Sequence, residues 1–438
     1  MKKLLLVQPS EESTLDLIHY SNSVLNTFKP LLPEGRLKEH LRSKKAINIP
    51  SLSLMILSAL TPKDKFEVQF VDEKIESIDY DCEADLIAIT TNTTIVNRAY
   101  EIATEFRKRG AKVVLGGVHS SVLPDEGLQY ADAVAIGEAE HIWQKMLNDF
   151  LRGNLKGKYK AGKYVNMEHD YVIPDNSILK KEYYMFDTSI ELSRGCPHNC
   201  SFCSDPIIYG DRYRTRDIEK VISQIEQTKS DYIFFADDNI IGKPKCAKTL
   251  LTELKKLDKR WVGSASVLLG RNPELTDLVI ESGCKFLIMG LESTSREALA
   301  QIGKRQNFEK DYGKFVRYLQ DNGVLVAGSF ILGFDSDSTQ TIREQYNYAQ
   351  KQGFLFYMPG VLTPYPGTPL FNQLEREGRL IHKNWEKYNV RSGIPVFSGQ
   401  NHTPEYLEQL ENTVKTNGIH YFFGELQKRP EIIEKFTN

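Results

Sequence analysis

Short apolar runs alternate with amphipathic helical patterns along most of this 438-residue chain, and this alternation constrains the fold more than any other feature. In the first third of the chain, strands are predicted at 4–7, 67–71, 86–90, 112–115 and 133–136. Helices are predicted between them at 52–60, 96–109 and 141–151. Strands that are apolar on both faces and separated by helices favour an α/β fold with a doubly wound, Rossmann-like parallel sheet.

The alternation stops over residues 151–184, a polar connector in which we expect a short hairpin around Gly162, and then resumes. Further strands are predicted at 188–192, 232–236, 261–267, 286–290, 325–332 and 354–361, with helices such as 218–229, 246–256 and 312–322. Six such repeats are two fewer than a closed eight-stranded barrel needs. The domain boundaries follow as 1–150, 151–184, 185–374 and 375–438, the last being a helical cap with an amphipathic helix at 404–417.

The composition indicates an ordinary globular protein. Hydrophobic residues make up 41% of the chain and charged residues 26%, and the net charge is −2. A charge so close to zero gives no bulk attraction to nucleic acid or to an anionic membrane, so neither is expected as a partner. No stretch reaches the roughly 20 apolar residues that span a bilayer, so no transmembrane segment is expected. The apolar run after Met1 is too short for a signal peptide and predicts a buried first strand.

Three of the six cysteines form a C-x3-C-x2-C cluster, namely Cys196, Cys200 and Cys203, directly after a predicted strand. Three thiolates are one fewer than the four that close an ordinary iron–sulfur or structural zinc site. The incomplete set leaves one metal position open to a small molecule. A zinc site that adds His198 is the alternative, although Cys200 lies close enough in sequence to strain it. Free thiolates indicate a reducing, cytoplasmic location.

This cysteine spacing resembles that of the radical S-adenosylmethionine (radical SAM) enzymes. In that family three cysteines hold a 4Fe-4S cluster, and the amino and carboxylate groups of S-adenosylmethionine bind the open iron. One electron from the cluster then breaks a carbon–sulfur bond and yields a 5′-deoxyadenosyl radical. The resemblance implies an open, six-stranded, TIM-like partial barrel, with its chemistry at the carboxyl ends of the strands.

The resemblance also implies roles for residues that match the family's motif positions. Phe202, inside the cysteine motif, would pack beside adenine, with an ordinary core position as the alternative. Asp237 and Asp238 would hold the methionine amino group, or else cap the next helix. Ser264 is expected to face the barrel interior, as is Ser266, two residues further along the same strand.

Two later strands carry further positions of this kind. Glu292 would lie close to the ribose or the methionine part of the cofactor, with a surface ion pair as the alternative. The backbone around Ile331 would contact adenine, because Gly328 and Gly333 allow a close approach. Lys304 could meet the cofactor carboxylate or remain solvent-exposed.

In the first domain, no G-x-G-x-x-G turn follows the first strand, which argues against an ordinary dinucleotide site. Glycine and hydroxyl residues instead gather after three predicted strands, where doubly wound sheets bind ligands. These candidate residues are Thr90, Thr91, Asn92, Gly116, Gly117, His119, Gly137 and Glu138. Together with the order of the two domains, they resemble the cobalamin-binding domain that precedes the radical SAM domain in one large subfamily.

The chain departs from classical cobalamin domains because it has no D-x-H-x-x-G motif, whose histidine is the lower cobalt ligand. The lower face would then be empty or be filled by water or another side chain. His119 is the candidate, although in the family this position more often braces the loop. A domain that has lost cobalamin and serves only as a scaffold is the other interpretation.

The resemblance as a whole implies a cobalamin-dependent radical SAM methyltransferase that acts on an unactivated carbon of a small-molecule or lipid-like substrate. Flavodoxin or ferredoxin would supply the electrons. Cyclisation or rearrangement by the same two domains is the main alternative, and a cobalamin or redox sensor is the non-enzymatic one. Methylthiolation is disfavoured, because the family of enzymes that catalyse it needs three more cysteines near the N-terminus and only Cys82 lies there.

Overall fold

The computed structural model describes residues 1–10, 49–184, 186–308 and 311–415. These residues divide into two compact units. The first contains residues 1–10, 49–184, 186–189 and 204–210, and the second contains 190–203, 211–308 and 311–415. Positions 416 and 417 of the predicted C-terminal helix lie outside the described residues, and positions 404–415 are helical.

The first unit is built on a parallel sheet with the strand order β2-β1-β3-β4-β5-β6. The strands are β1 (Lys2–Gln8), β2 (Phe66–Asp72), β3 (Leu86–Thr90), β4 (Lys112–Gly116), β5 (Ala133–Ile136) and β6 (Gly157–Lys160). The chain runs from β1 to β2 on one side and then crosses to β3 on the other. The topological switch point, where doubly wound sheets bind ligands, therefore lies beyond the ends of β1 and β3.

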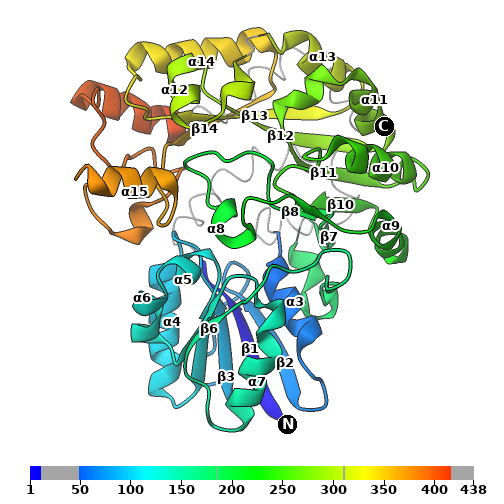
Figure 1. The fold of residues 1–438 in the computed structure, drawn as a ribbon, viewed down its shortest axis with the longest axis vertical. Coiled ribbons are helices and arrows are strands. Elements are labelled where there is room, and N and C mark those ends of the chain that lie inside the picture. Colours follow the sequence, from blue (N-terminus) through cyan, green and yellow to red (C-terminus); the bar gives the residue numbers. More distant parts are fainter. Residues whose placement is uncertain (11–48, 185, 309–310, 416–438) are drawn as a thin grey trace. The chain divides into compact units, whose positions relative to one another are not determined.

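Helices cover both faces of this sheet (Figure 1). They are α3 (Leu52–Leu60), α4 (Val96–Lys108), α5 (Val118–Val122), α6 (Pro124–Tyr130) and α7 (Trp143–Leu151), and the short helix α8 (Asp205–Tyr209) belongs to the same unit. Leu4 and Leu6 of β1 pack with Leu54 of α3 and Trp143 of α7. Alternate residues of a strand point to opposite faces, so Leu5 and Val7, which are equally buried, turn toward the other helix layer.

The hairpin predicted around Gly162 is wrong. The segment before it forms β6, which extends the sheet in parallel alongside β5. Within β6 only Tyr159 is buried, whereas Lys158 and Lys160 are exposed. An edge strand with one buried side chain has no apolar run, so periodicity could not reveal it.

The second unit contains an open sheet with the order β14-β13-β12-β11-β10-β7. Its strands are β7 (Ser189–Ile190), β10 (Tyr232–Phe235), β11 (Arg260–Ala265), β12 (Cys284–Glu292), β13 (Leu325–Leu332) and β14 (Phe356–Val361). The edge strands β7 and β14 are not paired with each other among the described residues, which makes the sheet a partial barrel. The predicted α/β fold class is confirmed in both units.

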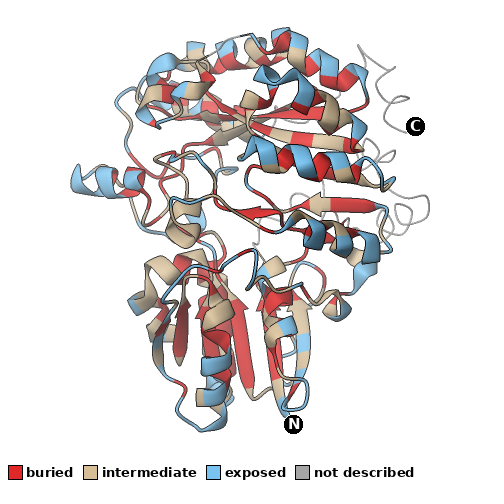
Figure 2. Cartoon of the chain, turned by 45° about the vertical axis from the view of Figure 1, so that its right-hand side comes forward, coloured by how far each residue is buried: buried red, intermediate tan, exposed pale blue. Residues whose placement is uncertain are grey.

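Helices follow the barrel strands in turn. They are α9 (Ile218–Gln227), α10 (Pro244–Leu254), α11 (Pro273–Glu281), α12 (Arg296–Gln301), α13 (Gly313–Asp321), α14 (Thr339–Gln352) and α15 (Pro369–Arg376). Figure 2 shows that the sheet strands are largely buried, while exposed residues lie along the outward faces of the helices. Among the described residues, no helix is long and apolar enough to cross a membrane.

Two predicted strands end two residues earlier than expected. The strand predicted at 188–192 is only β7, because the next residues form β8 (Ser193–Arg194), which pairs antiparallel with β9 (Arg214–Thr215). Strand β11 ends at Ala265, and the Ser266 hydroxyl accepts a hydrogen bond from the Leu268 amide at 3.3 Å. Ser266 therefore caps a turn, and the prediction that it is a strand residue is wrong.

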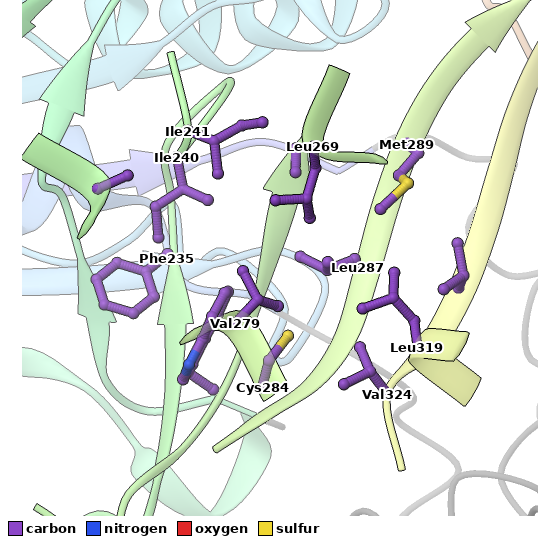
Figure 3. Packing of buried hydrophobic residues seen from close by; sticks show 14 of the residues in the cluster. Phe235, Ile240, Ile241, Leu269, Val279, Cys284, Leu287, Met289, Leu319 and Val324 are labelled. Carbon is purple, nitrogen blue, oxygen red and sulfur yellow. The ribbon is translucent and has the colours of Figure 1, made fainter. Parts of the chain in front are cut away.

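The main core of the second unit lies between the sheet and its helices (Figure 3). Leu287 and Met289 of β12 pack there with Val279 of α11 and Leu319 of α13. Cys284 is buried among these residues, and burial raises the pKa of its thiol well above the usual value. Cys284 is therefore a core residue and not a candidate metal ligand.

Candidate active site

The three clustered cysteines lie in one loop of the second unit that runs from Cys196 to Cys203. The backbone of Ser201 holds this loop on two sides. Its amide donates to the Ile302 carbonyl at 3.1 Å, and its carbonyl accepts from the Leu370 amide at 2.9 Å. The end of α12 and the start of α15 thus position the loop between them.

All three thiols are free of disulfides; Cys200 is buried, and Cys196 and Cys203 are half-buried. Among the described residues, no three His, Cys, Asp or Glu side chains stand in a ready-made metal-binding group. The fit to a cluster therefore rests on the donor set, which is three soft thiols on one short loop. That set suits iron–sulfur ligation with one iron left open. The imidazole pKa of His198 is lowered mainly by burial and further by the nearby positive charge of Lys304.

Asp237 braces the strand segment that leads into this loop. It is buried, and its carboxylate accepts hydrogen bonds from the Leu192 amide at 3.0 Å and from the Ser193 hydroxyl. Asp238 is exposed. The alternative that these aspartates cap the next helix is wrong, because α10 begins at Pro244 after the uncapped Lys243. A contact with a methionine amino group stays a prediction, for which Asp238 is the more accessible of the two.

Sequence reasoning missed three charged residues that support the same segment. Arg194 and Glu191 form a buried ion pair at 3.1 Å, with each side chain only 6% exposed. Arg216 donates to the Glu191 carbonyl at 2.9 Å through its guanidinium. Charged residues inside an apolar strand, directly before a cysteine cluster, were the signal that could have found Glu191 and Arg194. Buried charges persist only where partners compensate for their lost hydration.

A second buried ion pair, between Lys304 and Glu292, lies close to the cysteines. The two side chains are 12% and 8% exposed, and the Lys304 ammonium donates to Glu292. Burial opposes charge on Lys304, but Glu292, Cys200 and Cys196 together raise its pKa. The alternatives of a solvent-exposed Lys304 and a surface ion pair for Glu292 are therefore both wrong.

The backbone at the end of β12 makes room for this pair. Glu292 has a φ of +66°, and the register with β13 shifts between Gly290 and Glu292. A side chain on Gly290 would collide with both members of the pair. Asn307, which sequence reasoning also missed, donates its amide nitrogen to the carbonyls of Gly290 at 2.9 Å and Leu291 at 3.1 Å. Asn307 thus holds the irregular strand end in place.

Two of the predicted cofactor residues, Ser264 and Ile331, lie on the face of the barrel sheet that is opposite to the helices. Ser264 lies on the face of β11 opposite to Trp261 and Ala265, which pack with the helices. Phe202 and Ile331 are both partly buried, and both pack against one small apolar cluster that includes Ile302 and Phe334. The Ile331 carbonyl accepts from the Gln345 amide at 3.0 Å. The structure thus brings an aromatic ring of the cysteine loop and β13 to the same apolar surface.

The predicted residues of the first unit lie at the carboxyl ends of β3 and β4 and in the loops after β3, β4 and β5. The Thr91 amide donates to the Gly116 carbonyl at 2.7 Å, and the Thr91 hydroxyl lies 2.8 Å from that of Ser120. Gly117 has a φ of +117°, and a side chain there would collide with the Thr91 backbone. The contact between the two loops, rather than a bound ligand, therefore explains this glycine. Thr90 precedes this contact at the end of β3 and is half-buried.

The other residues of these loops are also engaged within the unit. His119 is buried, with Nδ1 3.2 Å from the Thr93 hydroxyl and Nε2 3.4 Å from Glu126. The side-chain Oδ1 of Asn92 accepts from the Ile95 amide at 3.2 Å, which supports the start of α4. The Gly137 amide donates to Ser121 at 3.0 Å, and buried Glu138 accepts from the Val165 amide at 2.9 Å. The loop after β4 is therefore tied to both of the other loops, and the loop after β5 is also tied to the connector.

Comparisons with known proteins assign a family to each of the two parts of the chain. Residues 190–349 match the radical SAM superfamily, and residues 44–146 match the B12 binding domain. Two methyltransferases from Chlorobaculum tepidum match most of the chain. The bacteriochlorophyllide d C-12(1)-methyltransferase is 33% identical to this chain over an alignment that covers 79% of this chain and 77% of the methyltransferase. The C-8(2)-methyltransferase is 32% identical, with coverages of 77% and 79%.

Among solved structures, the cobalamin-dependent S-adenosylmethionine radical enzyme OxsB has the same fold, with a TM-score of 0.68 and 16% identity over 100% of this chain and 70% of its own. The two units therefore define a radical SAM enzyme with a cobalamin-binding domain. The chain belongs to the cobalamin-dependent radical SAM methyltransferases. Its cofactors are a 4Fe-4S cluster, S-adenosylmethionine and cobalamin.

Proposed function

We propose that this enzyme transfers a methyl group from S-adenosylmethionine to an unactivated carbon of a small, largely apolar molecule. The observation that carries the proposal is the similarity to two C-methyltransferases over more than three quarters of the chain. Both relatives are named for methylation of bacteriochlorophyllide d, a tetrapyrrole. A chlorin-type tetrapyrrole is therefore the first substrate to test, and other lipid-like molecules follow.

Cys196, Cys200 and Cys203 would hold the cluster, and Ser201 positions the loop through its two backbone bonds. The bound cluster supplies the electron that cleaves S-adenosylmethionine, and bound cobalamin carries the methyl group. The ion pairs of the second unit have a supporting task. They hold the strand ends around the loop in place, and their own charges are fixed by pairing. Both effects favour a pre-organised site.

The S-adenosylmethionine site would use the inner side of the partial barrel. Phe202 and Ile331 offer the apolar surface on which an adenine ring can stack. Glu292 offers a carboxylate to ribose hydroxyls or to the ammonium group, while Lys304 neutralises its charge when no ligand is bound. Ser264 and Asp238 remain candidates for further polar contacts.

Cobalamin would bind beyond the switch point of the first sheet, against the loops that carry Thr90, Thr91, Gly116, Gly117, Gly137 and Glu138. Asn92 is the exposed residue among these loops. His119 braces the loops through Thr93 and Glu126 and would not reach cobalt without breaking both contacts. Its role would be to keep the cobalamin-facing loops in shape.

A rearranging or cyclising enzyme is the second candidate. One relative, 27% identical over 74% of this chain and 63% of its own, is the anaerobic magnesium-protoporphyrin IX monomethyl ester cyclase of Rubrivivax gelatinosus. Both candidates need an external electron source, for which flavodoxin or ferredoxin is suited. Both also need a reducing compartment such as the cytoplasm, because the three thiols must stay free.

The test is an anaerobic assay of the reconstituted protein with cobalamin, reductant and S-adenosylmethionine, with and without a chlorin. It would follow 5′-deoxyadenosine, S-adenosylhomocysteine and the mass of the chlorin. A methyltransferase forms both nucleoside products and adds one methyl group to the substrate. The Cys200→Ala variant should lose all 5′-deoxyadenosine, while Cys284→Ala, which changes a core cysteine, should retain it.

Formation of 5′-deoxyadenosine without S-adenosylhomocysteine would contradict methyl transfer and favour the rearranging enzyme. Activity in Cys200→Ala would contradict the assignment of the cluster ligands. Neither nucleoside product, from a protein that still holds iron and is supplied with substrate, would favour the sensor.

A further inference from the structure

The end of β13, which carries Ile331, is held by a segment far along the chain, residues 397–402. The first residue of this segment, Phe397, is buried in the same apolar cluster that Phe202 and Ile331 pack against. The proposed adenine surface, formed by Phe202 and Ile331, is therefore supported by a part of the chain that follows all six strands of the partial barrel. This segment is a candidate for shaping the S-adenosylmethionine site.

The side chain of His402 bridges the segment and the strand. Its Nδ1 lies 3.0 Å from the Gly399 amide nitrogen, and its Nε2 lies 3.1 Å from the carbonyl oxygen of Gly333, the residue directly after β13. These two partners determine the tautomer, because a backbone amide can only donate a hydrogen bond and a carbonyl can only accept one. His402 is therefore a neutral imidazole that accepts from Gly399 through Nδ1 and donates to Gly333 through Nε2.

The surroundings of the His402 ring fix its orientation. The ring stacks on Tyr406, with 5.5 Å between the ring centres and 23° between the planes, and the centre of the Phe397 ring also lies 5.5 Å away. A Cβ on Gly399 would collide with the imidazole, so a glycine is needed there to leave room for the ring. These contacts hold the imidazole in the orientation in which both nitrogens reach their partners.

Gly333 is the point through which His402 acts on the strand. The Gly333 amide donates to Asp337 at 2.9 Å, so the amide and the carbonyl of this residue are both held. Its φ of +100° lies in the region that favours glycine, and the chain turns away from β13 here. Ile331 lies two residues before this turn, so the position of its backbone depends on how firmly the turn is fixed.

Contacts of Asp335, in the loop after β13, fasten the same segment. Its carboxylate pairs with Arg379 and accepts a hydrogen bond from the Gln400 amide at 3.2 Å. The side-chain amide of Asn401 donates to the Asp335 carbonyl at 2.8 Å. These contacts anchor the segment beside the strand end, where the imidazole reaches Gly333.

We infer that His402 is a positioning residue for the nucleoside part of S-adenosylmethionine. It fixes the Gly333 carbonyl and packs on the Phe397 ring, and both of these support the surface on which adenine stacks. A surface that is already ordered binds a planar ring more tightly, because ordering it on binding costs conformational entropy. The inference rests on the proposed function, since it takes adenine to bind at Phe202 and Ile331.

The test is anaerobic calorimetry on the enzyme loaded with its cluster and cobalamin, without reductant, so that S-adenosylmethionine is not cleaved. The ligands are S-adenosylmethionine, 5′-deoxyadenosine and methionine. We expect His402→Leu, which removes both ring nitrogens, to weaken binding of the two nucleoside ligands about tenfold each. Methionine, which needs only the open iron, should bind unchanged. A general loss of structure would weaken all three ligands, so this pattern separates positioning from misfolding.

His402→Gln is the conservative variant, because its amide nitrogen can replace Nε2 as the donor to Gly333. It should bind both nucleoside ligands about threefold more tightly than His402→Leu does. His382→Leu is the matched control. His382 is another half-buried histidine that follows the barrel, and its Nδ1 has no hydrogen-bond partner among the described residues. This variant should leave all three affinities unchanged.

If His402→Leu fails to fold, Gly399→Ala decides, because its Cβ displaces the imidazole and removes no hydrogen-bonding group. It should also weaken nucleoside binding and leave methionine binding unchanged. Unchanged nucleoside affinity in these variants, or an equal loss for methionine, would overturn the inference and leave the proposed function standing. A wild type that binds methionine but neither nucleoside ligand would overturn the proposed adenine surface as well.

Discussion

Single residues around the cysteine loop combine burial with charge. Glu191 and Arg194 are paired with each other, and Glu292 is paired with Lys304. Each pair places one cation against one carboxylate where water is nearly excluded. Such a pair contributes little net stability as a whole, but the loss of one member leaves a buried charge alone.

We therefore expect Lys304→Met to lower the free energy of unfolding by about 3–5 kcal/mol, because Glu292 would remain buried without its partner. Urea denaturation under anaerobic conditions measures this change. Adding Glu292→Gln to Lys304→Met should recover much of the loss, since the uncompensated charge is then gone. Lys256→Met, which breaks an exposed pair with Glu253, is the matched control and should cost at most about 1 kcal/mol. Equal losses in both single variants would contradict the buried-pair interpretation.

At the scale of elements, the cysteine loop is held by the segments around it rather than by a regular structure of its own. Gly195, directly before Cys196, has a φ of +86°, which is a conformation that glycine adopts readily. Pro197 and the ring of Tyr213 pack around Gly242, which has no side chain to oppose them. The Tyr213 hydroxyl donates to the Asn239 carbonyl at 2.9 Å.

Gly242→Ala should disturb this packing. Its Cβ would lie 2.6 Å from the Tyr213 ring and 3.0 Å from Pro197, so one of them must move. We expect a loss of about 1–3 kcal/mol in the free energy of unfolding, together with lower iron and sulfide content after reconstitution. Gly162→Ala is the control, because a Cβ there meets nothing within 4 Å. Full iron content in Gly242→Ala would show that the loop does not depend on this contact.

At the scale of the whole molecule, two buried carboxyl groups influence stability as pH changes. Burial raises the pKa of Asp237 to about 7 and that of Asp337 to about 6, although backbone amides partly oppose the effect. The native state therefore holds these protons more tightly than the unfolded chain does. Their contribution to stability is complete below about pH 4 and is lost as pH rises through the native pKa values.

Asp337→Asn should remove part of this dependence. The amide oxygen of Asn can still accept from the Gly333 and Phe334 amides, as the carboxylate does at 2.9 and 3.0 Å. The wild-type free energy of unfolding should fall by about 2 kcal/mol more than that of the variant between pH 4 and 7. Denaturant unfolding across this range measures both slopes. Parallel curves would show that Asp337 does not titrate as its burial indicates.

Much of the fold could be predicted because its strands are buried on both faces. Helix α3 and strands β3, β5 and β13 have the predicted bounds, and the other predicted strands are found with small shifts or, for β7, in shortened form. The strand β6 was missed because only Tyr159 of it is buried. Among candidate residues, Cys196, Cys200 and Cys203 were visible because one loop supplies them all. Asn307 and Arg216 were not, because each acts on a segment at least 16 residues away.

The sequence by itself determined the α/β class, the two domains and the open set of three thiols, because periodicity and short-range spacing are local properties of the chain. Only the tertiary structure decided what the polar residues do. It brought the Asp237 carboxylate into hydrogen-bond contact with the strand segment before the cysteine loop. It also paired Lys304 with Glu292 and brought Gly117 close to the Thr91 backbone. The physical reason is that a buried charge or a close backbone approach is satisfied by whichever partner the fold brings near, and that partner is distant in sequence.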